Sequence, residues 1–247
     1  MPSEAQTVSP ETLASLEKIK KYDRIFFGHP LGLLILSMNE IWERFSFYGM
    51  KAILIYFMIA PVEKGGMGMP HLEAASVFGL YSCVSGLMIL PGGWISDIIM
   101  GQRRALFWGG VIILAGHLSM ALPHVWFFYL GMGLIILGTA LLKPSSAGMV
   151  VKLYPPGDPR QDAGYTIYYM CINVGALLGA LVCGYLGQNV SWHLGFGAAA
   201  VGMFLGIVVY RAGYRFIGDI GHLTAEELEP VYRRRNIKRF LVGVCIV

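Results

Sequence analysis

The chain has 247 residues, of which 55% are hydrophobic and 14% are charged, and its mean hydropathy is +0.59. This composition is too apolar for a soluble globular domain, so the sequence predicts an integral membrane protein. The net charge of +4 gives no support to nucleic-acid binding. The four cysteines lie in apolar segments without ligand spacing, so we expect no disulfide, metal site or cofactor. The sequence has no nucleophile motif that would indicate an enzyme.

Six apolar stretches are long enough to cross a membrane as helices, since about 20 residues span the hydrocarbon core. Prolines punctuate them: Pro30 suits a first helical turn, Pro61 ends the first helix, and Pro123 separates two later ones. Residues 1–30 are predicted to be a polar cytoplasmic tail. The predicted spans, which together make a transmembrane bundle over 31–212, are 31–60, 74–100, 104–122, 125–153, 163–187 and 193–212.

Most of the 19 Lys and Arg residues lie at positions that six spans would place on one side of the membrane. By the positive-inside rule that side is the cytoplasm. The sequence therefore predicts a multi-pass protein of the plasma (inner) membrane with a cytoplasmic N-terminus. Residues 213–235 are predicted to be a charged cytoplasmic linker. Residues 236–247 are apolar again and indicate the start of a further helix, so we expect one half of a larger protein.

The first predicted span contains four ionisable side chains within the segment NEIWERFSFYGMK, residues 39–51. At about 100° per residue, these side chains fall in one sector of roughly 140° of the helix surface, together with Phe47 and Tyr48. Ionisable groups at bilayer depth are costly and usually functional, so this face is the first candidate site. The four residues are Glu40, Glu43, Arg44 and Lys51.

The second and third predicted spans are joined by the segment GGWISDIIMGQRR. It resembles the loop signature G-x-x-x-D-x-x-x-G-x-R-R of the major facilitator superfamily. The resemblance implies a charge network that holds one closed state, although Ile98 replaces the usual Arg after the acid and weakens one arm. A tight turn with topology-setting arginines is the plainer alternative. The residues that carry the motif are Gly93, Asp97, Gly101, Arg103 and Arg104.

A second resemblance lies in the first span, where E-x-x-E-R-F-x-F-Y-G is similar to the E-x-x-E-R-F-x-Y-Y-G signature of proton-coupled oligopeptide transporters. GTALLKPSS and DAGYTIYYMCINVGALLG are similar to that family's fourth and fifth spans. The resemblance implies an all-α membrane fold, the six-helix N-terminal bundle of a major-facilitator transporter. Three residues depart from the family pattern: Phe47 replaces Tyr, Lys51 replaces Arg, and Gly86 stands where many members have Tyr.

Proton coupling is the first activity that the resemblance implies. Glu40 lies ~14 Å and Lys143 ~15 Å from the cytoplasmic ends of their helices, so the two can meet at one depth. A buried lysine would keep an acid ionised, and such a cluster titrates as a unit. Pro144 is expected to kink its helix, and a static ion pair is the structural alternative. The residues expected to couple protons are Glu40, Glu43, Arg44 and Lys143.

The resemblance also implies symport of di- and tripeptides with protons, at a site between this bundle and a C-terminal six-helix half. Positive side chains would meet the peptide carboxylate, Asn173 would hydrogen-bond the peptide backbone, and Tyr48 would either line the pocket or pack against a neighbour. The alternatives are a carrier of another small anion or amino acid derivative, and a half that does not transport alone. The residues expected to bind substrate are Arg44, Tyr48, Lys51, Lys143 and Asn173.

Overall fold

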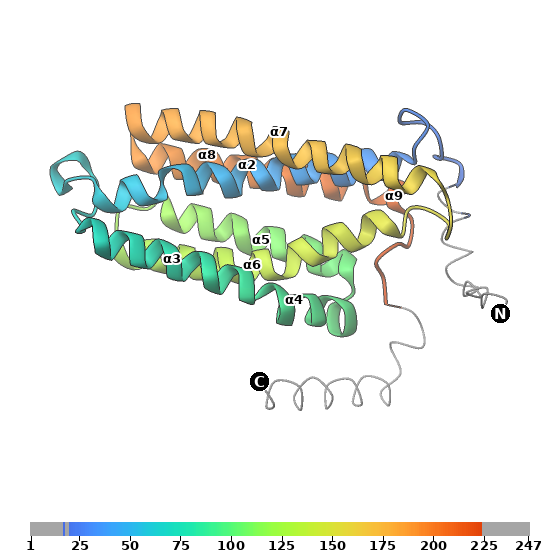
Figure 1. The fold of residues 1–247 in the computed structure, drawn as a ribbon, viewed down its shortest axis with the longest axis horizontal. Helices are drawn as coiled ribbons and strands as arrows, with labels where there is room; N and C mark the ends of the chain where they lie inside the picture. The colour runs from blue at the N-terminus through green and yellow to red at the C-terminus, as the bar shows by residue number, and fades with distance from the viewer. Residues whose placement is uncertain (1–16, 18–19, 224–247) are drawn as a thin grey trace.

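The computed structural model describes residues 17 and 20–223, and within them the fold is almost entirely helical (Figure 1). The predictions for most of the tail and for the segment after residue 223 lie outside the described residues. Short connections join the helices, which are α2 (Leu31–Ile59), the 3-10 turn η1 (Val62–Lys64), α3 (His71–Leu87), α4 (Ile89–Ile95), the π-helical turn η2 (Ser96–Met100), α5 (Gln102–Met120), α6 (Val125–Val151), α7 (Arg160–Asn189), α8 (Trp192–Ala212) and α9 (Tyr214–Ile217).

Within the part of the chain that the structure describes, four helical stretches can cross a membrane by length and composition: His71–Met100, Val125–Val151, Arg160–Asn189 and Trp192–Ala212. The other two predicted spans, α2 and α5, fall short of that measure because they are more polar. α2 contains the four ionisable residues described above, and α5 opens on two arginines and includes a histidine. The six predicted ranges differ from the observed helices by only a few residues at each end.

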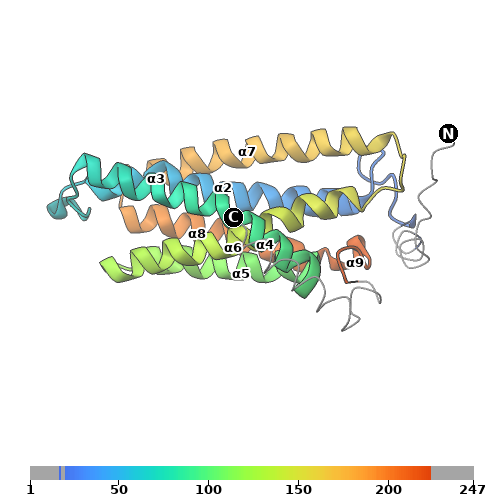
Figure 2. The same cartoon turned by 60° about the horizontal axis from the view of Figure 1, so that its bottom comes forward.

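The helices lie side by side along the long axis of the molecule in both views (Figures 1 and 2). α2 packs mainly against α7 and α8, while α5 packs against α6 and α8. Two buried apolar clusters fill the interior: Leu36 belongs to one of them and Phe45 to the other. The ionisable segment between Glu40 and Arg44 therefore lies where one apolar cluster gives way to the next.

The contact between α2 and α7 depends on two glycines of α7, four residues apart. A Cβ atom at Gly175 would collide with the carbonyl oxygen of Ile41, and one at Gly179 would collide with that of Phe45. The absence of side chains lets the two helix backbones touch, as small-residue spacings do in membrane helices. The two glycines therefore allow the close packing of α2 and α7.

The second predicted span is interrupted rather than continuous. α3 ends at Leu87 and α4 begins at Ile89, a break that is visible as a bend of the chain in Figure 1. Pro91 explains the break, since it has no N–H to donate to the carbonyl of Leu87. The stretch then ends in η2 and in Gly101, whose φ of 79° suits glycine far better than other residues.

α6 continues through the proline predicted to kink it. Pro144 has no N–H to bond to the carbonyl of Ala140, four residues earlier, so one helical hydrogen bond is missing at this turn. Gly92 of α4 lies directly against that carbonyl, so closely that a Cβ atom would clash with it. The free carbonyl of α6 and the bare backbone of α4 therefore face each other.

Apolar side chains are exposed along α3, α4 and α7 in this bundle. Leu80, Leu90, Leu177 and Leu181 each expose 60% or more of their surface. Extended exposed apolar surface of this kind marks contact with lipid or with another protein unit. The faces of these helices are therefore unlike the surface of a soluble domain.

Candidate functional site

The centre of α2 holds two acids and one arginine within the bundle. Glu40 and Glu43 are 1% and 0% exposed, and Arg44 is 8% exposed. Arg44 Nε donates a hydrogen bond to Glu40 Oε1 at 2.7 Å and lies 3.0 Å from Glu43 Oε2. A single guanidinium group thus serves two buried carboxylates, which leaves this trio one negative charge in excess when both acids are ionised.

Glu40 is fully satisfied by hydrogen bonds from three helices. Besides Arg44, its second oxygen Oε2 accepts hydrogen bonds from Ser146 Oγ of α6 at 2.9 Å and from Tyr168 OH of α7 at 2.6 Å. Ser146 Oγ and Tyr168 OH also lie 2.7 Å apart. Glu40 therefore ties α2 to both neighbouring helices as a hydrogen-bond acceptor.

Glu43 has a different environment although it is one helical turn away. Neither of its carboxylate oxygens accepts a hydrogen bond from a described residue. The one hydrogen on Arg44 Nε is directed at Glu40, so the contact with Glu43 is electrostatic only. A buried carboxylate without donors is costly when charged and becomes a hydrogen-bond donor when protonated. Glu43 is therefore the acid of this pair that lacks hydrogen-bond donors among the described residues.

The sequence argument expected Lys143 to pair with these acids, and the structure corrects this expectation. No described carboxylate lies within ion-pair distance of Lys143, whose Nζ instead sits over the ring of Phe47, 4.2 Å from its centroid. Its charge still interacts electrostatically with Glu43 and Glu40. Depth along the helices predicted that α2 and α6 meet here, but the direction of the Lys143 side chain could not be deduced from depth.

The other predicted substrate residues lie on the open side of the cluster. Tyr48 is 40% exposed and its ring packs edge-on against Phe47. Lys51 Nζ lies 5.4 Å from the Phe47 centroid. Asn173 is exposed on α7 and donates to the carbonyl of Tyr169 at 3.0 Å. Gly86 on α3 is exposed as well, and a Cβ atom there would meet nothing within 4 Å.

The loop motif does not form the expected charge network among the described residues. Asp97 Oδ1 accepts a hydrogen bond from Gln102 Nε2 at 2.8 Å. Arg103 turns toward α9 instead, where its guanidinium stacks on Tyr214 at 4.2 Å and donates to the carbonyl of Gly218. Arg104 is exposed. Gly93 packs on Pro144, since a Cβ atom at Gly93 would lie 3.4 Å from Pro144 Cβ. This motif therefore mainly fixes helix ends against each other.

Two contributors to the site, Ser146 and Tyr168, were missed by sequence reasoning. Both fall inside the segments that carried the family resemblance, but neither is charged, so a search for ionisable groups passed over them. Tyr168 is 4% exposed and Ser146 is fully buried. Both residues could have been found from the family resemblance of these two segments, because that resemblance includes uncharged residues as well as charged ones.

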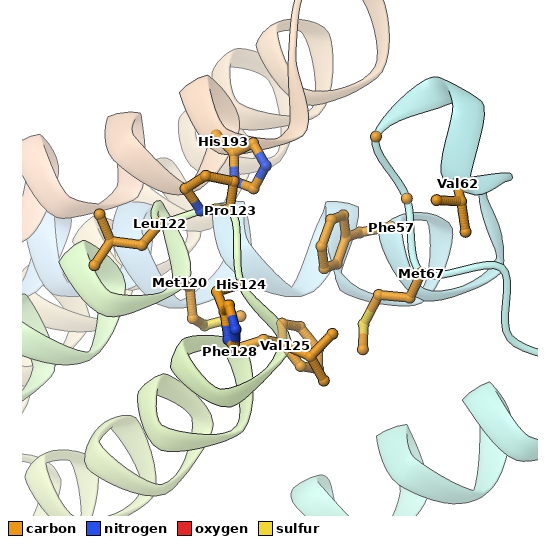
Figure 3. A pocket seen from close by; sticks show the side chains of 12 residues that line it. Phe57, Val62, Met67, Met120, Leu122, Pro123, His124, Val125, Phe128 and His193 are labelled. Atoms are coloured by element: carbon orange, nitrogen blue, oxygen red, sulfur yellow. The ribbon is translucent and has the colours of Figure 1, made fainter.

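A separate cavity of about 400 Å³ lies near η1, at the end of the bundle where α2 ends and α6 begins (Figure 3). Its walls are apolar apart from His124 and His193, and none of the predicted site residues lines it. His124 Nδ1 caps α6 by accepting from the backbone N–H of Trp126 at 3.3 Å. This cavity is therefore distinct from the charged cluster.

Comparison with known proteins gives consistent matches. The family model described as the POT family matches residues 103–233. The chain is 39% identical over 232 residues to the peptide transporter YePEPT of Yersinia enterocolitica and 38% identical over 236 residues to a di-/tripeptide transporter of Lactococcus lactis. It covers 45% and 47% of these two proteins, and they match 91% and 94% of it.

Solved structures agree with this result. A mutant of the peptide transporter POT superposes with a TM-score of 0.87 at 42% identity, covering 97% of this chain and 49% of that one. A POT family transporter in complex with 5-aminolevulinic acid gives 0.85 at 36% identity, covering 94% and 48%. The chain spans about half the length of the relatives it matches and corresponds to their N-terminal half. It belongs to the POT family of multi-pass membrane transporters, with the helical fold of the major facilitator superfamily.

Proposed function

We propose that this chain supplies the proton-coupling half of a symporter that carries di- and tripeptides across the membrane by alternating access. The peptide substrate is suggested by its relatives, which are peptide and di-/tripeptide transporters. The observation that carries the proton coupling is the difference between the two acids of α2. Glu40 has a donor for each oxygen, whereas the buried carboxylate of Glu43 has none among the described residues.

The coupling follows from the charge balance. While Glu43 is ionised, the nearby charges of Arg44 and Lys143 compensate it. A proton on Glu43 removes that negative charge, so the Lys143 ammonium becomes available to the carboxylate of a peptide. Proton binding and substrate binding would then favour each other, as a symporter requires. Arg44, Lys51 and Lys143 would face the peptide carboxylate, Asn173 its backbone, and a second six-helix half would complete the site.

We place the N-terminus in the cytoplasm, at the plasma (inner) membrane. Arginines of five segments gather at the end of the bundle that holds the start of α2, the α6–α7 connection and α9. At the opposite end Lys64 lies in η1. This asymmetry supports the orientation through the positive-inside rule. The arginines at the N-terminal end are Arg24, Arg103, Arg160, Arg211 and Arg215.

The test is uptake of labelled dialanine into proteoliposomes, using the product of the complete gene, with and without an inward proton gradient. Glu43→Gln should lose gradient-driven accumulation, because glutamine cannot release a proton, yet keep gradient-free exchange of dialanine. Glu40→Gln and Lys143→Ala should also lose accumulation. Glu73→Gln, at an exposed acid in the first turn of α3, is the matched control and should behave as the wild type. Wild-type accumulation by Glu43→Gln would refute this coupling site.

A second candidate is transport of an amino acid derivative with a free carboxylate. It is favoured by the open space at Gly86 and by the similar POT family transporter that was solved with 5-aminolevulinic acid. The same liposomes distinguish the two candidates. In a peptide carrier, unlabelled dipeptides should block uptake of the labelled substrate. In a carrier of amino acid derivatives, 5-aminolevulinic acid should block that uptake and dialanine should not.

A further inference from the structure

Two lysines and two aromatic rings form a chain of contacts across three helices beside the acid cluster. Lys143 Nζ of α6 lies 4.2 Å from the Phe47 centroid of α2, and Lys51 Nζ lies 5.4 Å from the same ring. Lys51 Nζ also lies 5.1 Å from the centroid of Phe78 on α3. All three distances are within the range of about 6 Å in which a ring attracts a cation.

Aromatic rings are the groups over which these ammonium nitrogens lie. No described carboxylate lies within ion-pair distance of either lysine, because both acids of α2 are engaged by Arg44. Phe47 is 7% exposed, so the contact is largely shielded from water, where the attraction of a cation to a ring is greatest. The two positive charges are thus held near the cluster without a direct ion pair to a described acid.

The two departures from the family signature on α2 are in contact with each other. Phe47 and Lys51 are four residues apart, on one face of the helix, and the structure joins them directly. A lysine on its flexible stem is less pre-organised than an arginine. A ring that contacts its ammonium group restricts the positions which that group can adopt.

We propose that Phe47 is a positioning residue that holds the ammonium groups of Lys51 and Lys143 together as one anion subsite for the substrate carboxylate. The proposal rests on the proposed function, since it specifies how the substrate carboxylate is held. Phe47 itself does not contact the anion. Its ring sets the separation of the two cations, and its removal weakens recognition of charge while leaving the rest of the peptide site intact.

The first measurement compares two competitors of labelled dialanine uptake: unlabelled dialanine and its C-terminal amide, which lacks the carboxylate. Phe47→Leu keeps an apolar side chain and removes the ring. It should lower the preference for the acid over the amide by about 10-fold, the size expected for two shielded cation–ring contacts. Phe47→Tyr keeps the ring and should retain the wild-type preference.

Phe45→Leu is the matched control for loss of packing. Phe45 lies two residues away on α2, is 8% exposed and packs against Trp42, and no described cation lies over its ring. It should lower the amount of folded protein without changing the ratio of acid to amide affinity. An unchanged ratio in Phe47→Leu, or an equal fall in Phe45→Leu, would overturn the proposal.

The second measurement needs no transport and so separates this inference from the proposed function. Lysines carrying ¹³C-methyl groups, introduced by reductive methylation, report ring currents by NMR, and Lys51→Arg and Lys143→Arg assign the two signals. Both signals should be shifted by the ring in the wild type and should move to ordinary positions in Phe47→Leu. If wild-type protein moves no dialanine but shows these shifts, the peptide assignment fails and the placement of the lysines stands. Signals that do not respond to Phe47→Leu would refute the placement.

Discussion

Two arginines in this molecule each lie between two carboxylates, one inside the bundle and one at its surface. Arg44 is paired with Glu40 and Glu43, and the side chains of all three are 10% exposed or less. Arg160 binds Asp23 at 2.9 Å and Asp158 at 2.7 Å, and its own side chain is 27% exposed. Each group consists of one arginine and two carboxylates, glutamates in one and aspartates in the other, so the formal charge is the same.

Their surroundings give these groups different properties. Around Arg160 water can compensate the excess negative charge, so the group mainly ties the segment before α2 to the connection between α6 and α7. Around Arg44 there is no such solvent, and the excess charge must be balanced by a proton or by another cation. The comparison shows that two groups with the same kinds of charge differ mainly in burial, which determines how far solvent can compensate their excess charge.

The largest effect is expected when each arginine is replaced by methionine, which keeps much of the side-chain volume. Arg44→Met should lower the free energy of unfolding by about 3–5 kcal/mol, because two buried acids then lack a cation. Arg160→Met should lower it by about 1 kcal/mol or less, because its pairs are solvent-screened. Chemical denaturation of the purified protein in detergent measures both values.

A second substitution tests the reason for this difference. Adding Glu43→Gln to Arg44→Met should recover part of the lost stability, since one of the uncompensated charges disappears. Adding Asp158→Asn to Arg160→Met should have little effect. Equal losses for the two arginine variants would mean that burial does not distinguish the groups.

A smaller effect is expected from a substitution at the close contact between α7 and α2, beside the buried group. Gly175→Ala should destabilise the protein by about 1–3 kcal/mol, the usual cost of overpacking. Its new methyl group would press on Arg44 Cβ, 2.9 Å away, and on the carbonyl of Ile41. Gly184→Ala is the control on the same helix, since nothing lies within 4 Å of its virtual Cβ. A loss of stability in Gly184→Ala as large as in Gly175→Ala would contradict this account.

The smallest effect is expected at the surface group and concerns pH. The hydrogen bond from Arg160 lowers the pKa of Asp158 below its ordinary value. A carboxyl whose pKa is lowered by folding stabilises the protein above its unfolded pKa, near 4, and loses that contribution as the pH falls through the folded value. Asp158→Asn should therefore lower the melting temperature slightly at pH 6 and not at pH 2. If the difference in melting temperature between variant and wild type were the same at pH 2 as at pH 6, this account of Asp158 would be wrong.

Much of the fold was predictable because the signals were local. Hydropathy located the helices, and prolines located the ends, so the predicted ranges lie close to α2, α6 and α8. The break before α4 was not predicted, although Pro91 was visible in the sequence. A proline can be accommodated inside a membrane helix, as Pro144 is in α6, and only the packing around each proline decides between the two outcomes.

The candidate site was predictable in its membership but not in its pairing. Periodicity on α2 is enough to place Glu40, Glu43 and Arg44 on one face, because the helix geometry is fixed. The partners from other helices depend on rotation and side-chain direction, which one helix does not determine. For that reason Lys143 was expected at a carboxylate and was found over a ring.

The missing hydrogen bond in α6 has a mechanical consequence. Because Pro144 cannot donate to Ala140, the helix can flex at this turn without breaking a backbone bond, and Gly92 presents no side chain that would obstruct the movement. Lys143 is the residue immediately before Pro144. The turn of α6 that lacks a backbone hydrogen bond is therefore the turn that carries this lysine.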